Sequence, residues 1–348
     1  MALTSDRTAS RGGAASLSLP EQFGRYRLLT RLAVGGMGEV YLARYGRPGQ
    51  ERLVVIKRLL PTLAADDDFH EAFKAEARIG HLLNHPNIVQ TLDAGTVEGQ
   101  RFIAFEYVHG PSLVKLLARA VTLGRRFSLE LAFHISVCLS RAIDYVHRRC
   151  DLEGNPLEIV HMDLAPHNVL ITEDGYPKLH DFGIARTLAR RTRVRPFRGR
   201  SAYLAPEQLD GLDVDQRVDL FALGVLMHEM IVGRPLFRAP SDQATATRIL
   251  HARIPNPRIV RSDCPARLAD VVMRALARDR DSRYQTAGEI LRDLEACAVL
   301  HGIGPSTARM RAEISELAHS VMKLAISQQL TPTVVDPAEF GLQETTQI

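Results

Sequence analysis

The sequence predicts an α+β protein of two lobes, a small β-rich lobe followed by a larger, mainly helical one. Between about residues 24 and 108, short apolar runs at 54–56 and 102–105 are separated by Gly and Pro turns, which is typical of strands. From residue 112 to about 300, apolar residues recur at helical spacing over longer stretches. The His-Gly-Pro sequence at 109–111 separates the two patterns and predicts a hinge, so a cleft is expected between the lobes.

Composition fits one large folded unit with short appendages. The chain has 348 residues, of which 45% are hydrophobic and 24% charged, close to the average for a soluble globular protein. Its 44 Lys and Arg against 40 Asp and Glu give a net charge of +4, which argues against a dedicated nucleic-acid binder. The four cysteines lack metal-ligand or disulfide spacing, and we find neither a membrane span nor a secretory segment. A cytoplasmic protein is therefore expected.

Helix signals divide the chain further. In the first lobe, Asp66, Asp67 or Asp68 can cap a helix that ends before the His-Pro-Asn sequence at 85–87. Helices with buried faces are predicted at 129–148, 218–231, 265–277 and 287–300. An amphipathic helix is predicted at 306–329, which docks on the lobe or pairs with a partner. The predicted organisation is a flexible leader at 1–23, a two-lobed domain at 24–300, a C-terminal helix region at 301–330 and a flexible tail at 331–348.

A glycine-rich turn at residues 32–41 is the first stretch that indicates chemistry. Glycines allow backbone N–H groups to come close to phosphate oxygens, although such a turn is more often an ordinary hairpin. Lys57 ends the apolar run that follows, and Glu76 lies in the next helix. A Lys57–Glu76 pair can hold the ammonium toward nucleotide phosphates, which makes phosphate binding the sharper interpretation.

Three side chains in the second lobe predict a magnesium site. Asp163 and Asn168 lie in one loop, and Asp181 follows thirteen residues after Asn168 in an Asp-Phe-Gly sequence. Carboxylate and amide oxygens are the hard ligands that Mg²⁺ prefers, and Asp163 could also accept a hydroxyl proton. A single Asp-x-x-x-x-Asn sequence is commonplace in loops, but the joint order of these motifs is not.

In this order of motifs the chain resembles the protein kinases, in particular the bacterial serine/threonine kinases of eukaryotic type, over about residues 26–300. The resemblance implies a bilobal protein-kinase fold, ATP and Mg²⁺ as cofactors, a protein substrate and a signalling role. It also implies that Lys57 contacts the α and β phosphates and pairs with Glu76. Asp163 then orients or deprotonates the substrate hydroxyl, while Asn168 and Asp181 hold Mg²⁺.

The resemblance also implies a nucleotide pocket and two internal braces. Beside Lys57 and Glu76, the pocket residues are Leu32, Gly35, Gly36, Met37, Gly38, Val40, Val55, Phe105, Glu106, Val108 and Leu170. The backbone of Glu106 and Val108 would bind adenine. Glu207, in the Ala-Pro-Glu sequence that closes the activation segment, is expected to pair with Arg283, and Asp219 is expected to brace the catalytic loop.

Four departures from the family pattern bear on whether catalysis survives. Ala33 replaces a loop glycine, Val55 replaces a smaller pocket residue, and Met162 replaces an arginine that receives a phosphorylated activation loop. Ala165 stands where serine/threonine kinases usually place a lysine that neutralises the transferring phosphoryl group. One hypothesis is that His167, partly protonated, replaces this lysine; a loop histidine without a role is the equal alternative.

Three functions remain open from the sequence. The first is an ATP- and Mg²⁺-dependent serine/threonine protein kinase, attenuated by the four departures. The second is a pseudokinase that acts as a nucleotide-binding scaffold or regulatory module, with the helix at 306–329 available to a partner. The third, a small-molecule phosphotransferase of the aminoglycoside or choline kinase type, is disfavoured by Glu207, Asp219 and Arg283. An arginine-rich segment at 184–204 is by default a solvated loop. Beside the proposed substrate cleft it could instead attract an acidic substrate or partner, or retain a phosphate on Thr187, Thr192 or Ser201.

Overall fold

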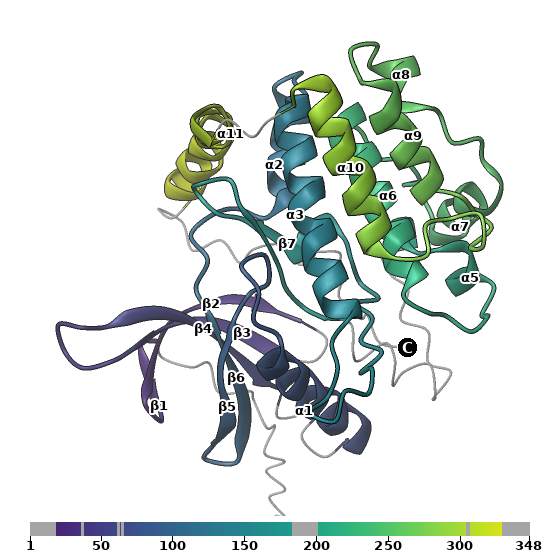
Figure 1. Cartoon of the computed structure of the whole chain (residues 1–348). Coiled ribbons are helices and arrows are strands. Elements are labelled where there is room, and N and C mark those ends of the chain that lie inside the picture. The colour runs from purple at the N-terminus through teal and green to yellow at the C-terminus, as the bar shows by residue number, and fades with distance from the viewer. Residues whose placement is uncertain are drawn as a thin grey trace, which may run out of the picture.

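The computed structural model describes residues 19–35, 38–60, 63, 66–182, 201–303 and 307–328. Within them the predicted α+β architecture of two lobes is confirmed, and a sheet-based lobe lies below a helical lobe in Figure 1. Most of the predicted leader, all of the predicted tail and most of the arginine-rich segment lie outside the described residues. No helix in the described ranges is both long enough and apolar enough to cross a membrane.

The first lobe is built on a six-stranded antiparallel sheet with the order β1-β2-β3-β4-β6-β5. Its strands are β1 (Glu21–Phe23), β2 (Tyr26–Val34), β3 (Gly38–Tyr45), β4 (Arg52–Leu59), β5 (Thr91–Val97) and β6 (Gln100–Glu106). Alternation along β4 buries Val54 and Ile56 in the lobe's core, together with Tyr41 of β3. The same alternation puts Val55 and Lys57 on the opposite face of the strand, where Lys57 reaches the second lobe.

One helix, α1 (Asp67–Leu82), packs on this sheet as the sequence predicts. Among the three candidate caps it is Asp66 whose side chain accepts hydrogen bonds, from the backbone N–H groups of Asp68 and Phe69. Phe73 is 2% exposed and packs with Leu59 of β4 and Ile103 of β6. This packing holds the middle of α1, where Glu76 lies, above β4.

The second lobe is a helical bundle with one small hairpin. Its elements are α2 (Leu113–Thr122), α3 (Leu129–His147), β7 (Val169–Ile171), β8 (Pro177–Leu179), α5 (Pro206–Leu209), α6 (Arg217–Val232), α7 (Asp242–His251), α8 (Pro257–Val260), α9 (Ala266–Ala275) and α10 (Ala287–His301). The four helices predicted in this lobe are confirmed to within two residues at each end. The sequence did not predict α7, because only Thr245 and Ile249 of its ten residues are buried.

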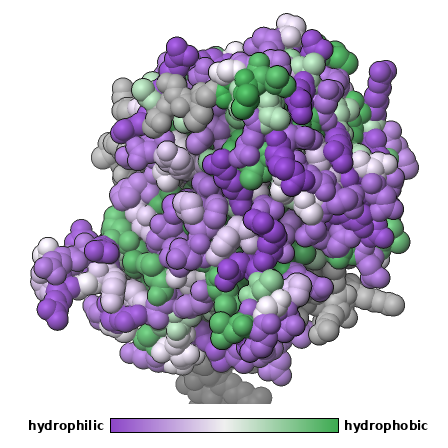
Figure 2. All heavy atoms as spheres, in the orientation of Figure 1, coloured by the Kyte–Doolittle hydropathy of each residue, from purple (hydrophilic) through white to green (hydrophobic). Residues whose placement is uncertain are grey.

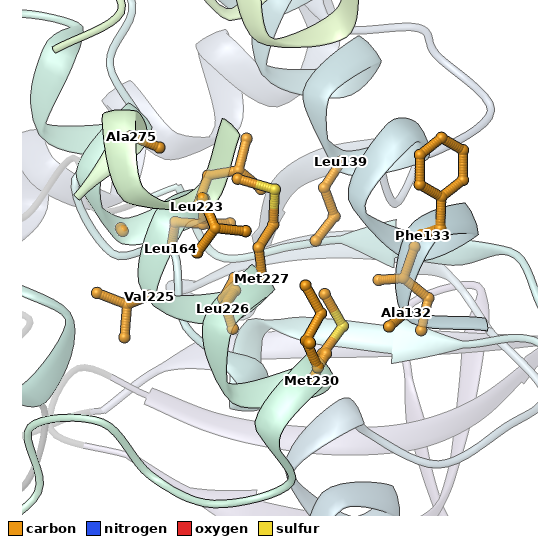
Figure 3. Packing of buried hydrophobic residues seen from close by; sticks show 14 of the residues in the cluster. Ala132, Phe133, Leu139, Leu164, Leu223, Val225, Leu226, Met227, Met230 and Ala275 are labelled. Atoms are coloured by element: carbon orange, nitrogen blue, oxygen red, sulfur yellow. The ribbon is translucent and has the colours of Figure 1, made fainter. Parts of the chain in front are cut away.

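Helix α6 is the centre of this lobe. Every residue from 218 to 232 is buried, and Figure 3 shows Leu223, Leu226 and Met227 of α6 packed toward Leu139 of α3. A helix that is buried on all sides and mostly apolar lies inside a domain. The face drawn in Figure 2 is, by contrast, mainly hydrophilic with small scattered apolar patches. The core therefore lies around α6, and the last helix, α11 (Thr307–Gln328), lies at the side of the lobe beside α2 (Figure 1).

The connection between the lobes rests directly on β7. The backbone N–H of Ile171 donates to the carbonyl of Pro111 (2.9 Å), and that of Glu173 donates to the carbonyl of His109 (3.2 Å). Gly110 between them has a φ of +152°, and a Cβ there would lie 1.8 Å from the Ile171 carbonyl oxygen. The hinge therefore requires glycine, because any side chain would push the connection away from β7.

We expect the Gly110→Ala variant to lower the free energy of unfolding by about 2–5 kcal/mol, from backbone strain of about 1–2 and steric overlap of about 1–3. Gly99→Ala is the matched control, since Gly99 also has a positive φ (+80°) but has open space around it. This control is expected to lose only the strain contribution. Chemical denaturation measures both, and equal losses in the two variants would contradict the proposed close approach to β7.

Candidate active site

Three side chains from separate elements meet around one ammonium group. Lys57 Nζ of β4 lies 2.6 Å from Glu76 Oε1 of α1 and 3.5 Å from Asp181 Oδ1, which follows β8. The Lys57 and Glu76 side chains are only 17% and 11% exposed, whereas Asp181 is 47% exposed. The predicted Lys57–Glu76 pair is therefore present, and it joins the first lobe to the carboxylate of the second.

The charges of this cluster keep Lys57 protonated. Burial alone would lower the pKa of Lys57, but the carboxylates of Glu76 and Asp181 outweigh it and raise the net pKa. Burial raises the pKa of Glu76, while the ammonium of Lys57 opposes that rise. The protonated Lys57, held 2.6 Å from Glu76, therefore places a positive charge next to the exposed Asp181.

Asp163 and Asn168 form a second cluster that is tied to the first. The amide Nδ2 of Asn168 donates to both the backbone carbonyl (2.8 Å) and the carboxylate (3.1 Å) of Asp163. The Nε2–H of His161 donates to the carbonyl of His180 (3.2 Å), and the N–H of His180 donates to the carbonyl of Asn168 (3.0 Å). Asp181 follows directly, so these hydrogen bonds hold the loop of Asp163 and Asn168 next to it.

A buried carboxylate from α6 supports this loop from below. Asp219 is 1% exposed and accepts hydrogen bonds from the backbone N–H groups of His161 and Met162 (2.8 Å each) and from Nε2 of His147 (2.9 Å). Burial by itself raises the pKa of Asp219, but the contact with His147 and the other hydrogen bonds lower it overall. Met162 has a φ of +63°, a strained conformation that these bonds hold in place. The predicted bracing role of Asp219 is thus confirmed, whereas His147 was not predicted.

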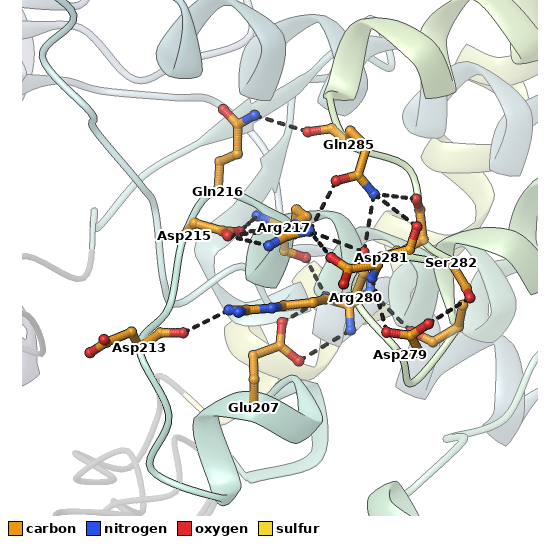
Figure 4. A network of polar contacts seen from close by, with 12 residues as sticks. Glu207, Asp213, Asp215, Gln216, Arg217, Asp279, Arg280, Asp281, Ser282 and Gln285 are labelled. Carbon is orange, nitrogen blue, oxygen red and sulfur yellow. Dashed lines mark hydrogen bonds and ion pairs between the residues drawn. The ribbon is translucent and has the colours of Figure 1, made fainter.

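The predicted pair of Glu207 and Arg283 is also confirmed. Arg283 donates to both carboxylate oxygens of Glu207 at 2.8 and 3.1 Å, and both residues are buried. Around the pair, Arg217 binds Asp215, Asp281 and Gln285 in the network drawn in Figure 4. Removing one partner of this buried pair would leave an uncompensated charge, so breaking the pair is costly. The pair therefore holds the segment that contains Glu207 on the helical lobe.

A second anchor for the same segment was missed by the sequence analysis. Tyr203, four residues before Glu207, donates its hydroxyl proton to Glu229 Oε2 (2.8 Å), and the N–H of Leu236 donates to Glu229 Oε1 (2.9 Å). Burial raises the pKa of Glu229 to about 7, although its two hydrogen bonds oppose that rise. No local pattern marks this pair, because Tyr203 and Glu229 lie 26 positions apart in the sequence.

The predicted pocket residues are spread over both lobes, on strands of the first sheet, directly after β6 and on β7. Val40 of β3 pairs with Lys57, and Val55 of β4 pairs with Phe105 of β6. Leu32 is 39% exposed on β2, Val108 is buried, and Leu170 lies on β7. Gly36 and Met37 lie outside the described residues.

Gly35 and Gly38 are joined by a backbone hydrogen bond from the N–H of Gly35 to the carbonyl of Gly38 (2.7 Å). A Cβ on Gly38 would lie 2.4 Å from the Arg58 carbonyl oxygen, so the close packing of β3 on β4 already requires glycine there.

Glu106 makes a contact across the lobes that was not predicted. Its Oε1 accepts hydrogen bonds from Lys178 Nζ of β8 (2.6 Å) and from the N–H of Gln90 (2.9 Å). The side chain of Glu106 is thus committed to the second lobe, which leaves its backbone as the part available to a ligand. Glu106 and Lys178 lie 72 positions apart in the sequence, which explains why no sequence pattern linked them.

Ala165, where a lysine is usual, and His167, its proposed replacement, both lie within the loop. Ala165 is 1% exposed, and His167 is half-buried in the short 3₁₀ helix Pro166–Asn168. The Nε2 atom of His167 is itself buried.

Comparison with known proteins agrees with the fold. The family profile described as "Protein kinase domain" matches residues 26–294, which is most of the chain. The chain therefore belongs to the protein kinase family, as the order of motifs predicts.

Its relatives are bacterial kinases. The chain is 37% identical over 277 residues to the tyrosine-protein kinase MasK of Myxococcus xanthus, an alignment that covers 79% of this chain and 43% of the relative. It is 35% identical to the probable serine/threonine-protein kinase SCO3848 of Streptomyces coelicolor, with 82% and 42% covered. The chain thus spans less than half the length of these relatives. Among solved structures, the PknI kinase domain of Mycobacterium tuberculosis matches with a TM-score of 0.60 and 28% identity, covering 81% of this chain and 99% of that one.

The pKa of Glu229 predicts a specific pH dependence of stability. Because the folded value of about 7 exceeds the ordinary value of 4.5, the folded protein retains a proton that the unfolded chain releases between these pH values. Stability is therefore expected to fall as pH rises through this window, by about 3 kcal/mol from this group. In Glu229→Gln this side chain cannot ionise. The decrease in unfolding free energy from pH 5 to pH 8 should therefore be smaller than in the unaltered chain.

Glu295→Gln is the matched control, since Glu295 is 52% exposed and pairs with Arg141 on the surface. It is expected to keep the pH dependence of the unaltered chain. An identical pH profile for the unaltered chain and Glu229→Gln would rule out the raised pKa.

Proposed function

We propose that this chain is an ATP- and Mg²⁺-dependent protein kinase that transfers the γ-phosphoryl group to serine or threonine hydroxyls of a protein substrate. The observation that carries the proposal is the meeting of Lys57, Glu76 and Asp181 beside the linked pair of Asp163 and Asn168. The first lobe contributes a fixed cation, and the second contributes oxygen ligands and a carboxylate. This is the set of groups that phosphoryl transfer requires.

The residues present fit a nucleotide with its metal. The ammonium of Lys57, held by Glu76, can bind the α and β phosphates, and the backbone of Glu106 and Val108 can bind adenine. Asn168 uses its Nδ2 for Asp163, which orients its amide oxygen as a ligand, and the carboxylate of Asp181 is 47% exposed. Both would hold Mg²⁺, which supplies positive charge beside the phosphate oxygens when bound.

Asp163 is proposed to handle the acceptor hydroxyl. Its carboxylate is 5% exposed and is held by the amide of Asn168, so its orientation is set before a substrate arrives. It would accept the hydroxyl proton as the oxygen attacks the γ-phosphorus, and the bond to the departing ADP breaks. The activation segment that ends at Glu207, anchored by Arg283, is proposed to carry the substrate-binding surface.

The choice of serine or threonine as acceptor rests on the relatives. SCO3848 and PknH of Mycobacterium tuberculosis, which is 34% identical over 270 residues, are named as serine/threonine-protein kinases, whereas MasK is named as a tyrosine-protein kinase. Pro166 favours serine and threonine, while Ala165 leans toward tyrosine. A map of the phosphorylated residues therefore decides this point.

We expect Asp163→Asn to lower the rate of phosphate incorporation from radiolabelled ATP by about 10²–10⁴-fold, because the carboxylate that accepts the proton is lost. The matched control is Asp270→Asn, which makes the same change at an exposed position of α9. Incorporation should remain unchanged in the control. Equal incorporation by the unaltered chain and Asp163→Asn would contradict the proposal, and mass spectrometry of the products would identify the acceptor residues.

A second candidate function is that of a pseudokinase that binds nucleotide as a scaffold. It is favoured by Ala165, which is buried and presents no cation where a lysine is usual. Val55 in the predicted pocket and Met162 in the loop also favour a pseudokinase. Nucleotide binding without incorporation by the unaltered chain would support this function over the first.

If the chain is a kinase, we propose that His167 supplies the missing positive charge during transfer. His167→Ala is then expected to lower kcat by about 10²–10³-fold, with little change in the KM for ATP, because the charge acts only on the transition state. His251→Ala, on the exposed surface of α7, is the control and should keep the kinetics of the unaltered chain. An unchanged kcat in His167→Ala rules the role out.

A further inference from the structure

The C-terminal helix α11 packs against the helical lobe as part of its core. Met310, Ile314 and Leu317 recur at helical spacing, are 1–2% exposed and belong to the same apolar cluster as α3 and α6. The helix lies beside α2, at the side of the lobe (Figure 1). The apolar face of its described half is therefore covered by this chain itself.

A carboxylate on α11 also binds the N-cap residue of α3. Glu313 accepts hydrogen bonds from the backbone N–H of Ser128 (2.8 Å) and from its hydroxyl (2.6 Å). Ser128 is the N-cap of α3, and its Oγ accepts from the N–H of Leu131 (3.1 Å). A negative charge beside the first turn of a helix is stabilising, so Glu313 links α11 to α3 at a defined position.

Three ion pairs surround this contact and define the register of the helix. Their members are Arg125 with Glu316 (2.8 Å), Arg309 with Glu130 (3.3 Å) and Arg311 with Asp174 (3.2 Å). Each includes groups that are half or more exposed, so each contributes little to stability alone. Together they orient α11 between the start of α3 and the turn that joins β7 to β8.

The turn that joins β7 to β8 packs closely against α11. Gly175 has a φ of +90°, and a Cβ placed on it would lie 3.1 Å from Ile314 Cδ1 and 3.6 Å from Met310 Cβ. The helix therefore rests on the turn at Gly175. A Cβ at this position would lie in tight contact with the end of the Ile314 side chain.

The turn connects α11 to the predicted nucleotide pocket. The β7 strand carries Leu170, and the backbone of Ile171 and Glu173 is hydrogen-bonded to the hinge at Pro111 and His109. On the other side of the turn, Lys178 of β8 holds Glu106. A continuous set of packed elements thus runs from α11 through β7 and β8 to the hinge.

We propose that α11 is an intramolecular clamp that holds the β7–β8 hairpin against the hinge and thereby sets the affinity of the chain for nucleotide. The proposal rests on the proposed nucleotide site. When α11 is docked, Leu170 and the hinge backbone are held in one arrangement. When α11 undocks, the hairpin loses its contact with Ile314 at Gly175. Nucleotide binding must then also order the hairpin, which lowers the affinity.

The edge of the contact between α11 and the start of α3 lies at the molecular surface. A surface hollow of about 670 Å³ lies beside α11, lined by residues that include Ser128, Glu313, Arg126 and Arg261. Solvent therefore reaches the hydrogen bonds between Ser128 and Glu313. The hollow lies away from Lys57 and Asp181, so it belongs to the docking contact and not to the nucleotide site.

The test uses the full chain and ADP with Mg²⁺, which binds without phosphoryl transfer. Ile314→Asp places a charge in the apolar contact and is expected to weaken ADP binding by about 3-fold to 30-fold in calorimetry. Ala308→Asp, which adds the same charge at an exposed position of α11, is the matched control and should keep the affinity of the unaltered chain. Hydrogen exchange should show lost protection in α11 and in residues 171–179 of Ile314→Asp only.

Glu313→Ala keeps the apolar contact and is the second variant, in case Ile314→Asp unfolds the lobe. It is expected to weaken ADP binding in the same direction by a smaller factor. Lost protection of α11 with unchanged ADP affinity would overturn the clamp while leaving the proposed function intact. Absence of ADP binding by the unaltered chain would instead overturn the proposed function, and the clamp with it.

Discussion

The site depends on the hydrogen bonds that the buried carboxylate of Asp219 accepts. It lies on α6, a helix buried on every side, and it holds the backbone of His161 and Met162 by two hydrogen bonds of 2.8 Å. Because α6 is also the centre of the apolar core, the position of the loop that carries Asp163 is set by the buried core of the lobe. A strained residue such as Met162 can persist only in such surroundings.

The second constraint is electrostatic and joins the two lobes. Lys57 and Glu76 form a pair inside the first lobe, and Asp181 of the second lobe completes the cluster. A buried ammonium is stable only with nearby negative charge, so this cluster favours the arrangement in which the lobes meet. Glu106 and Lys178 add a second ion pair across the same junction. Both pairs flank the region where we propose that the nucleotide binds.

Much of the fold was predictable because its signals are local. The cap at Asp66 and the helices around residues 129–148 and 287–300 follow from capping chemistry and from one apolar face. The helix α7 was missed since its buried face is only two residues wide. His147 and Glu229 were missed for another reason: each acts on a partner far along the chain or on a loop, and nothing near it in sequence records that partner.

The sequence by itself determined which chemical groups are present and in which order, because motif spacing and residue type are properties of the chain alone. It thereby determined the two-lobed fold and the candidate groups Lys57, Asp163, Asn168 and Asp181. Only the tertiary structure decided which of them touch, which carboxylates are buried, and that the face of α11 is covered by its own lobe. These outcomes depend on packing and solvent exclusion between distant segments, which no local pattern encodes.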